Sequence, residues 1–201
     1  HVRSRRQRQM CIRDRHDYVE NNPQKRINEV NVYCGSYLPN WRPGIDYRKC
    51  YSAIPELGGG VHIDLIHDID YVYWIFGKPI SHRGICRHVS SLGIEAIDYA
   101  NYQLFYPGFT ASIILNYYRT DYKRTLEVIF EDDTWVVNLK ENKIMDAKGN
   151  VIFKGNNSIA DTYKTQLEYF INAISKRENP ENNVNSAYDI LKICLSYEGF
   201  K

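Results

Sequence analysis

The chain has 201 residues, of which 43% are hydrophobic, so it is long enough to bury a core without disulfide bonds. Its formal net charge of +2 comes from an arginine-rich start; without residues 1–15, 20 of the 26 basic and 23 of the 24 acidic side chains remain. The rest of the chain is slightly acidic, which excludes a broad basic surface for nucleic acid, and no apolar run approaches the ~20 residues that cross a membrane.

The first residues and the cysteines set the expected surroundings of the fold. We expect residues 1–16 to be a non-native or disordered tail, because their arginines are not interleaved with aromatic residues; an arm that binds nucleic acid is the alternative. The five cysteines form no CxxC pair, which is typical of reduced thiols in a cytoplasmic protein. Residues 17–201 are predicted to form one domain.

A strand and a long loop open this domain. Val30, Val32 and Cys34 alternate with polar neighbours, which predicts a strand over Ile27–Tyr37. The following loop, Leu38–Leu57, is rich in proline, glycine and aromatic residues. A loop of this length is uncommon in a small domain unless it binds something.

A helix comes next, led by three glycines. It is predicted over Val61–Phe76, with Gly77 as its stop signal. Runs rich in β-branched and aromatic residues then alternate with turn residues, which indicates an antiparallel meander. The expected strands are Ile80–Ser90, Tyr99–Tyr106, Thr110–Tyr118, Thr125–Phe130, Thr134–Leu139 and Val151–Phe153.

Two helices close the chain. Ser158 is the expected cap of the first, which runs to Lys176; its apolar residues at helical spacing are Leu167, Phe170, Ile171 and Ile174. The second begins at Asn185 or Ser186, and its expected inward residues are Ala187, Ile190, Leu191 and Cys194. The pattern predicts an α+β fold: an open, mostly antiparallel sheet with helices packed on one face.

The glycine-led helix carries the candidate chemistry. At ~100° per residue, one polar stripe holds Asp64, His67, Asp68 and Tyr71, while His62 falls on the apolar side. A histidine accepts a proton near neutral pH, and a carboxylate three residues before it can stabilise the imidazolium. The alternative is a solvated face on which Asp64 favours the positive end of the helix.

Residues around this helix have two readings each. Gly59 and Gly60 allow a backbone or a ligand to approach closely, or they form a hinge. Trp41 and Arg42 form a ligand clamp or a stacked surface pair. Arg119 meets an anionic sugar or lies in solvent. No strand–GxGxxG–helix unit occurs, so we expect no dinucleotide-binding domain in this chain.

Together these segments resemble the Gfo/Idh/MocA family (glucose–fructose oxidoreductase, inositol dehydrogenase, rhizopine catabolism). The stretch from Gly58 to Asp70, followed by Tyr73-Trp74-Ile75-Phe76-Gly77, is similar to the family's GGG…D…HxID…WLFG pattern. The loop from Tyr37 to Gly44 and the helix around Tyr163 are also similar to its members. The likeness covers about residues 17–201.

The resemblance implies a two-domain enzyme whose first domain binds NAD or NADP and whose second holds the substrate and forms oligomers through its sheet. His67 then matches the catalytic acid/base, Asp64 the carboxylate that assists it, and Asp70 the acid that follows. The substrate is expected to be a sugar, sugar acid, cyclitol or nucleotide sugar, in a homodimer or homotetramer. The predicted substrate-binding residues are Tyr71, Trp41, Arg42, Arg119 and Tyr163, and the predicted cofactor-binding residues are Gly59 and Gly60.

Two departures from the family and two rival functions stand beside this reading. Asp64 and His67 are three residues apart, whereas many members have four, and the first domain is absent, so we expect an inactive fragment. One rival is a metal hydrolase using His62, Asp64, His67 and Asp70, but on a helix His62 points roughly opposite His67. The other is a non-catalytic domain that dimerises through its sheet.

Overall fold

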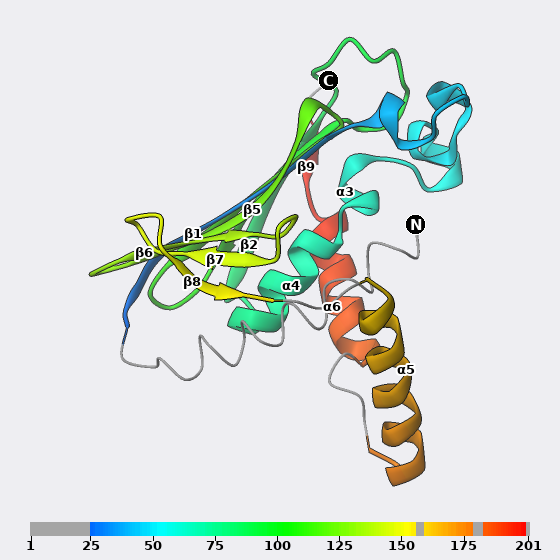
Figure 1. The fold of residues 1–201 in the computed structure, drawn as a ribbon. Coiled ribbons are helices and arrows are strands. Elements are labelled where there is room, and N and C mark those ends of the chain that lie inside the picture. Colours follow the sequence, from blue (N-terminus) through cyan, green and yellow to red (C-terminus); the bar gives the residue numbers. More distant parts are fainter. Residues whose placement is uncertain (1–24, 156–158, 179–182, 200–201) are drawn as a thin grey trace.

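The computed structural model describes residues 25–155, 159–178 and 183–199, which form one sheet with helices on one of its faces (Figure 1). The predicted tail 1–16 and the cap Ser158 lie outside these residues. The strands are β1 (Ile27–Tyr37), β2 (Ser81–Arg87), β3 (Tyr99–Phe105), β4 (Thr110–Asn116), β5 (Tyr118–Phe130), β6 (Thr134–Asn138), β7 (Lys143–Met145), β8 (Val151–Lys154) and β9 (Glu198–Gly199).

The nine strands form a single open sheet in the order β8-β7-β6-β5-β1-β4-β3-β2-β9. All neighbouring pairs are antiparallel except β1 with β4 and β2 with β9. The predicted α+β class with a mostly antiparallel sheet is therefore confirmed. The sequence missed the short strands β7 and β9.

The simple meander was wrong at one place. Strand β1 lies between β4 and β5, which are consecutive in the sequence and separated only by Tyr117. Its last residue, Tyr37, pairs with Tyr118, and the amide of Leu38 donates to the carbonyl of Tyr117 at 2.9 Å. The β4–β5 turn thus opens around the end of β1, which no local pattern of apolar residues encodes.

Alternation along the strands places the core on the face that the helices cover. Val30 pairs with Ala111, Val32 with Ile113 and Cys34 with Leu115, and all six side chains are buried. The intervening residues of β1 and β4 lie on the opposite face and are mostly half-buried or exposed. Burial of one face fixes the register, because a slip by one residue would turn the apolar side chains outward.

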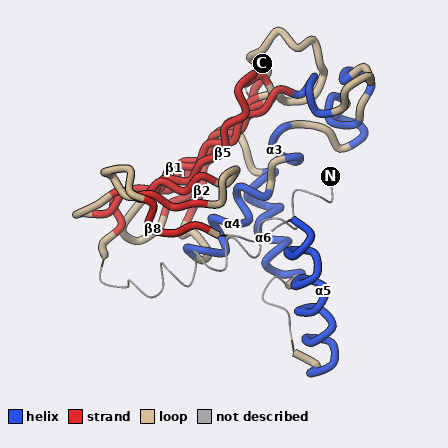
Figure 2. The backbone as a smooth tube through the Cα atoms, viewed as in Figure 1, coloured by secondary structure: helices blue, strands red, loops and turns tan. Residues whose placement is uncertain are grey.

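The helices are α3 (Val61–Asp64), α4 (His67–Phe76), α5 (Ile159–Lys176) and α6 (Val184–Leu195). Figure 2 shows them on one side of the sheet, with α4 and α6 against it. No described helix is long and apolar enough to span a membrane.

The predicted continuous helix Val61–Phe76 was wrong, because it is interrupted at Leu65 and Ile66. There the amide of Ile66 bonds the carbonyl of Ile63, a tighter i to i−3 turn. The predicted loop after β1 is ordered into four short 3₁₀ helices: Leu38–Trp41, Tyr47–Lys49, Tyr51–Ala53 and Pro55–Leu57. Aromatic residues from this segment pack against the core.

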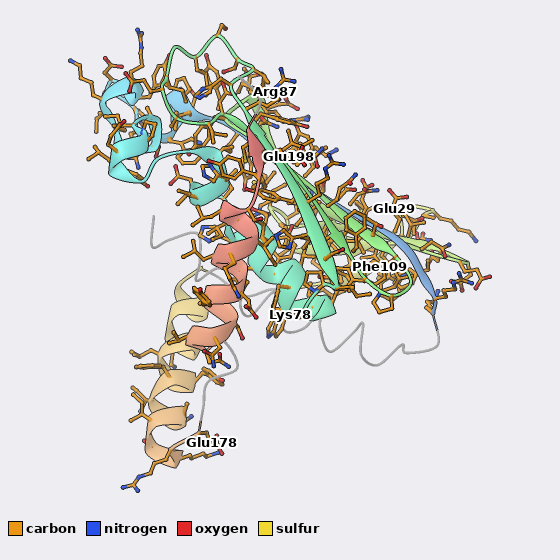
Figure 3. The ribbon with its side chains drawn as sticks, turned by 180° about the vertical axis from the view of Figure 1, so that it is seen from behind. Glu29, Lys78, Arg87, Phe109, Glu178 and Glu198 are labelled. Atoms are coloured by element: carbon orange, nitrogen blue, oxygen red, sulfur yellow. The ribbon has the colours of Figure 1, made fainter. Side chains whose placement is uncertain are left out.

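The last two helices bury less than the pattern predicts. On α6, Ile190 and Cys194 are inward as expected, but Leu191 is exposed and Ile193 is buried in its place. Helix α5 extends away from the sheet, and in Figure 3 Glu178, just past its end, lies far from Glu29 on β1. Its apolar stripe is exposed: Leu167 59%, Phe170 54%, Ile171 51% and Ile174 61%.

Candidate active site

The three glycines join the aromatic loop to α3, and each has a backbone reason to be glycine. Gly58 has φ +78° and Gly60 φ +125°, conformations that other residues rarely adopt. A Cβ on Gly59 would lie 2.1 Å from the carbonyl oxygen of Tyr51. The amides of Gly59 and Gly60 donate to the carbonyls of Ile54 and Ser52, at 3.0 and 3.1 Å. The close approach here is therefore made by the chain's own backbone.

Asp64, at the end of α3, reaches the sheet. Its Oδ2 accepts a hydrogen bond from the hydroxyl of Tyr117 at 2.5 Å, and both side chains are buried. Burial, and after it the charge of Asp64, raises the pKa of the Tyr117 phenol well above its ordinary value. The tyrosine is therefore a permanent donor and Asp64 a carboxylate acceptor in this bond.

Four predicted site residues converge on Tyr117. Besides Asp64, the indole of Trp41 meets its ring edge-on, at 5.3 Å between centroids. The backbone of Gly60 and the charge of Arg42 partly offset the rise in the pKa of Tyr117. Trp41 is fixed in turn by its indole N–H, which donates to Ser36 Oγ at 3.1 Å. Arg42 also lies 5.1 Å from the ring centroid of Tyr51.

His67, the first residue of α4, is 4% exposed. Among the described residues, neither Nδ1 nor Nε2 of His67 has a hydrogen-bond partner. A buried imidazole without a partner for either nitrogen costs free energy, and such groups are uncommon in folded proteins. Tyr71, one turn along, is also buried. The predicted polar stripe is thus enclosed by the fold, which contradicts a solvated face.

Asp68 has a structural partner. The guanidinium of Arg124 on β5 donates to its two carboxylate oxygens at 3.0 and 2.8 Å, and the side-chain exposures are 0% for Asp68 and 11% for Arg124. Burial alone lowers the pKa of Arg124, but the facing charge of Asp68 more than offsets this and raises it. This bidentate pair anchors α4 to the sheet next to His67.

His62 lies on the apolar side of α3, as predicted. Burial lowers the pKa of its imidazole to about 4, although Asp64 acts in the opposite direction. Its ring packs edge-on against Tyr197, at 5.3 Å between centroids. His62 is therefore a neutral core residue at neutral pH. Among the described residues, no three His, Cys, Asp or Glu side chains come together as metal ligands.

Three predicted residues lie apart from this cluster or escape description. Asp70 is half-buried on α4. Arg119 is engaged by Asp121, whose Oδ2 accepts from its guanidinium at 2.6 Å, and it stacks over Tyr33. The side chain of Tyr163 falls outside the described residues. Asp64 and Tyr117 form a buried hydrogen-bonded pair, and His67 is buried three residues further along the chain.

Sequence reasoning missed Tyr117, although a signal was present. Ala111, Ile113 and Leu115 alternate along β4 and are all buried on the helix side. Continuing the alternation by two residues puts Tyr117 on the same face, beside the start of the glycine-led helix. The pattern could therefore have placed this phenol near Asp64.

Comparisons with known proteins identify relatives of this fold. The profile of the GFO/IDH/MocA C-terminal domain matches residues 24–136. No curated protein matches the chain. UDP-N-acetylglucosamine 3-dehydrogenase from Acidithiobacillus ferrooxidans is similar in structure, with a TM-score of 0.70 at 15% identity over 96% of this chain and 59% of that one.

Two further solved structures are similar. Levoglucosan dehydrogenase, in complex with NADH and levoglucosan, gives a TM-score of 0.77 at 12% identity over 95% of this chain and 61% of that one. Myo-inositol 2-dehydrogenase from Lactobacillus plantarum gives 0.67 at 19% identity over 94% and 59%. The chain spans about three fifths of the length of these structures. Identities this low establish a shared fold and not a shared substrate.

Proposed function

Because the chain belongs to the GFO/IDH/MocA family through the C-terminal domain, we propose that it is the substrate side of a nicotinamide-dependent oxidoreductase that acts on a CH–OH group. The proposed substrates are a sugar, sugar acid, cyclitol or nucleotide sugar. The similar solved structures are dehydrogenases of a nucleotide sugar, levoglucosan and myo-inositol, which favours this class. The observation that carries the proposal is the buried His67 with two unpartnered ring nitrogens.

His67 is the proposed acid/base. A substrate hydroxyl that enters beside it supplies the missing hydrogen-bond partner, and one ring nitrogen takes the hydroxyl proton as the alcohol becomes a carbonyl. Asp64, three residues earlier and held by Tyr117, stabilises the imidazolium that forms. In the reverse direction His67 returns the proton. Trp41, Arg42 and Tyr71 are the proposed substrate contacts.

The cofactor is proposed to be held mainly by a further domain that precedes this one. When bound, NAD or NADP supplies the acceptor for the hydride of the substrate carbon. In this chain the amides of Gly59 and Gly60 already bond the carbonyls of Ile54 and Ser52, so the glycine segment is occupied by backbone. We therefore expect this segment to pack against a bound cofactor and not to donate these two amide hydrogen bonds to it.

The open face of the sheet is the proposed surface for a homodimer or homotetramer. Helices cover the opposite face (Figure 2). On the open face, Tyr33 of β1 and Ser112 and Ile114 of β4 are half-buried. A domain that only dimerises through this face is the second candidate function. It predicts the same oligomer without any turnover.

The test is to express the gene with its upstream region and to assay NAD(P)H formation with a panel of sugars, cyclitols and nucleotide sugars. His67→Ala is expected to lower kcat by about 10²–10⁴-fold. His88→Ala, which removes an exposed histidine, is the matched control and should keep full activity. Turnover that survives His67→Ala would remove His67 from the mechanism, and a stable oligomer without turnover would favour the dimerisation domain.

A further inference from the structure

We propose that Tyr117 is a positioning residue that fixes the carboxylate of Asp64, the proposed partner of His67. The proposal rests on the proposed function, because it assigns a role to a residue that supports the acid/base pair. Its physical basis is the hydrogen bond of 2.5 Å from the Tyr117 hydroxyl to Oδ2 of Asp64.

Tyr117 is held from several sides, so its hydroxyl has a fixed position. Its amide donates to the carbonyl of Asp98 at 3.0 Å, and its carbonyl accepts from the amide of Leu38 at 2.9 Å. These bonds tie both sides of its peptide backbone to separate parts of the chain. Its ring is fully buried against the edge of Trp41. Tyr117 sits where the β4–β5 turn opens around the end of β1, a rigid point of the sheet.

Asp64 is held less firmly by its own helix. Helix α3 has four residues and ends at Asp64, and the chain turns at Leu65 before α4 begins with His67. A carboxylate at the end of so short a helix rotates about its side-chain bonds unless something stops it. The bond from Tyr117 holds one carboxylate oxygen and so limits this rotation.

The direction of this bond is set by protonation. Burial and the charge of Asp64 both keep the proton on Tyr117, so the phenol donates and does not compete as a base. A hydrogen bond donated to a carboxylate takes up part of its negative charge. Tyr117 therefore tunes how strongly Asp64 stabilises a protonated His67, as well as where Asp64 points.

The test uses this 201-residue chain and follows the titration of His67 by NMR, with the signal assigned from a His67→Gln variant. Tyr117→Phe removes only the hydroxyl. We expect the titration midpoint of His67 to rise by about 0.5–1 pH unit, because the freed carboxylate keeps more of its charge. In an Asp64→Asn background the same substitution should shift it by less than about 0.2 pH unit, since the coupled charge is gone.

Tyr102→Phe is the matched control. Tyr102 is also fully buried, but its hydroxyl donates to the carbonyl of Cys194 and not to Asp64. It should leave the His67 titration in place. A Tyr117→Phe variant that is folded and shows no shift, or that shows the same shift with Asp64→Asn, overturns the proposal.

A second measurement covers the case in which Tyr117→Phe does not fold. In the Asp64→Asn chain, the NMR signals of the Tyr117 ring carbons should move, because the carboxylate that accepts from the phenol is replaced by an amide. Signals that stay in place overturn the proposal. None of these measurements needs cofactor or substrate. An absence of turnover in the longer protein would therefore contradict the proposed function, while the effect of Tyr117 on Asp64 and His67 could still be measured.

Discussion

The buried pair of Asp68 and Arg124 gives the sharpest test of how α4 is attached to the sheet. Asp68→Asn keeps the shape of the side chain and removes its charge. Arg124 then remains buried with no opposite charge, and breaking a buried pair in this way costs about 3–5 kcal/mol. That cost is a large fraction of the about 5–15 kcal/mol by which domains of this size are stable.

The assay is urea denaturation followed by circular dichroism at neutral pH. The double variant Asp68→Leu/Arg124→Met removes both charges, and we expect it to lie within about 1 kcal/mol of the unchanged chain, because apolar replacements of buried pairs are often neutral. Arg83→Met is the surface control: its pair with Glu198 has exposures of 62% and 51%, and it should cost less than about 1 kcal/mol.

A cost below about 1 kcal/mol for Asp68→Asn would refute this reasoning. It would mean that water reaches Arg124 and that α4 does not exclude solvent from the ion pair. If the double variant were as unstable as Asp68→Asn, the contribution of this pair would come from packing of the aliphatic part of Arg124 and not from its charge.

Three further outcomes are expected. Burial lowers the pKa of His62 from 6.5 to about 4, so as the pH falls the unfolded chain binds a proton before the folded chain does. The free energy of unfolding should therefore be full above pH 6.5 and fall by about 3 kcal/mol towards pH 4. In urea denaturation, His62→Gln should lose this pH dependence of the free energy of unfolding. Gly59→Ala should destabilise the chain by about 3 kcal/mol or more, because its Cβ meets fixed carbonyls, while Gly108→Ala, with nothing within 4 Å, should change the melting temperature little. Phe170→Ser on α5 should reduce self-association, measured by light scattering, without changing the stability of the chain, because Phe170 is exposed. The control Ile193→Ser, in the core, should unfold the chain. A large loss of stability from Phe170→Ser would show that α5 packs against the domain.

Local patterns predicted the elements that bury one face. The alternation of Val30, Val32 and Cys34 gave β1 its observed bounds, and the predicted strand Tyr99–Tyr106 differs from β3 by one residue. The same information could not predict that β1 inserts between β4 and β5. Strand order depends on which distant backbone edges pair, and apolar periodicity is identical for either arrangement.

The start of β5 shows a different limit. Arg119, Asp121, Lys123 and Arg124 interrupt the apolar pattern, so the strand was predicted to begin only at Thr125. In the structure Lys123 and Arg124 pair with β1, and Arg124 is buried because Asp68 neutralises it. A buried ion pair between two segments 56 residues apart leaves no periodic signal.

For the candidate site, helix geometry placed Asp64, His67 and Tyr71 on one face and assigned His62 to the core. The structure encloses that face and adds a partner from outside the helix, the phenol of Tyr117. The glycines were expected to allow a close approach, and the approaching group is the backbone of the 3₁₀ segment.

Hydride transfer is the central claim, and isotope transfer tests it most directly. The longer protein would be given a substrate of the proposed class that carries deuterium on the carbon bearing the reacting hydroxyl, and the reduced nicotinamide would be analysed by mass spectrometry. The account predicts one deuterium in the reduced cofactor and none released to water. Deuterium found in the solvent, or product formed with an unlabelled cofactor, would contradict it.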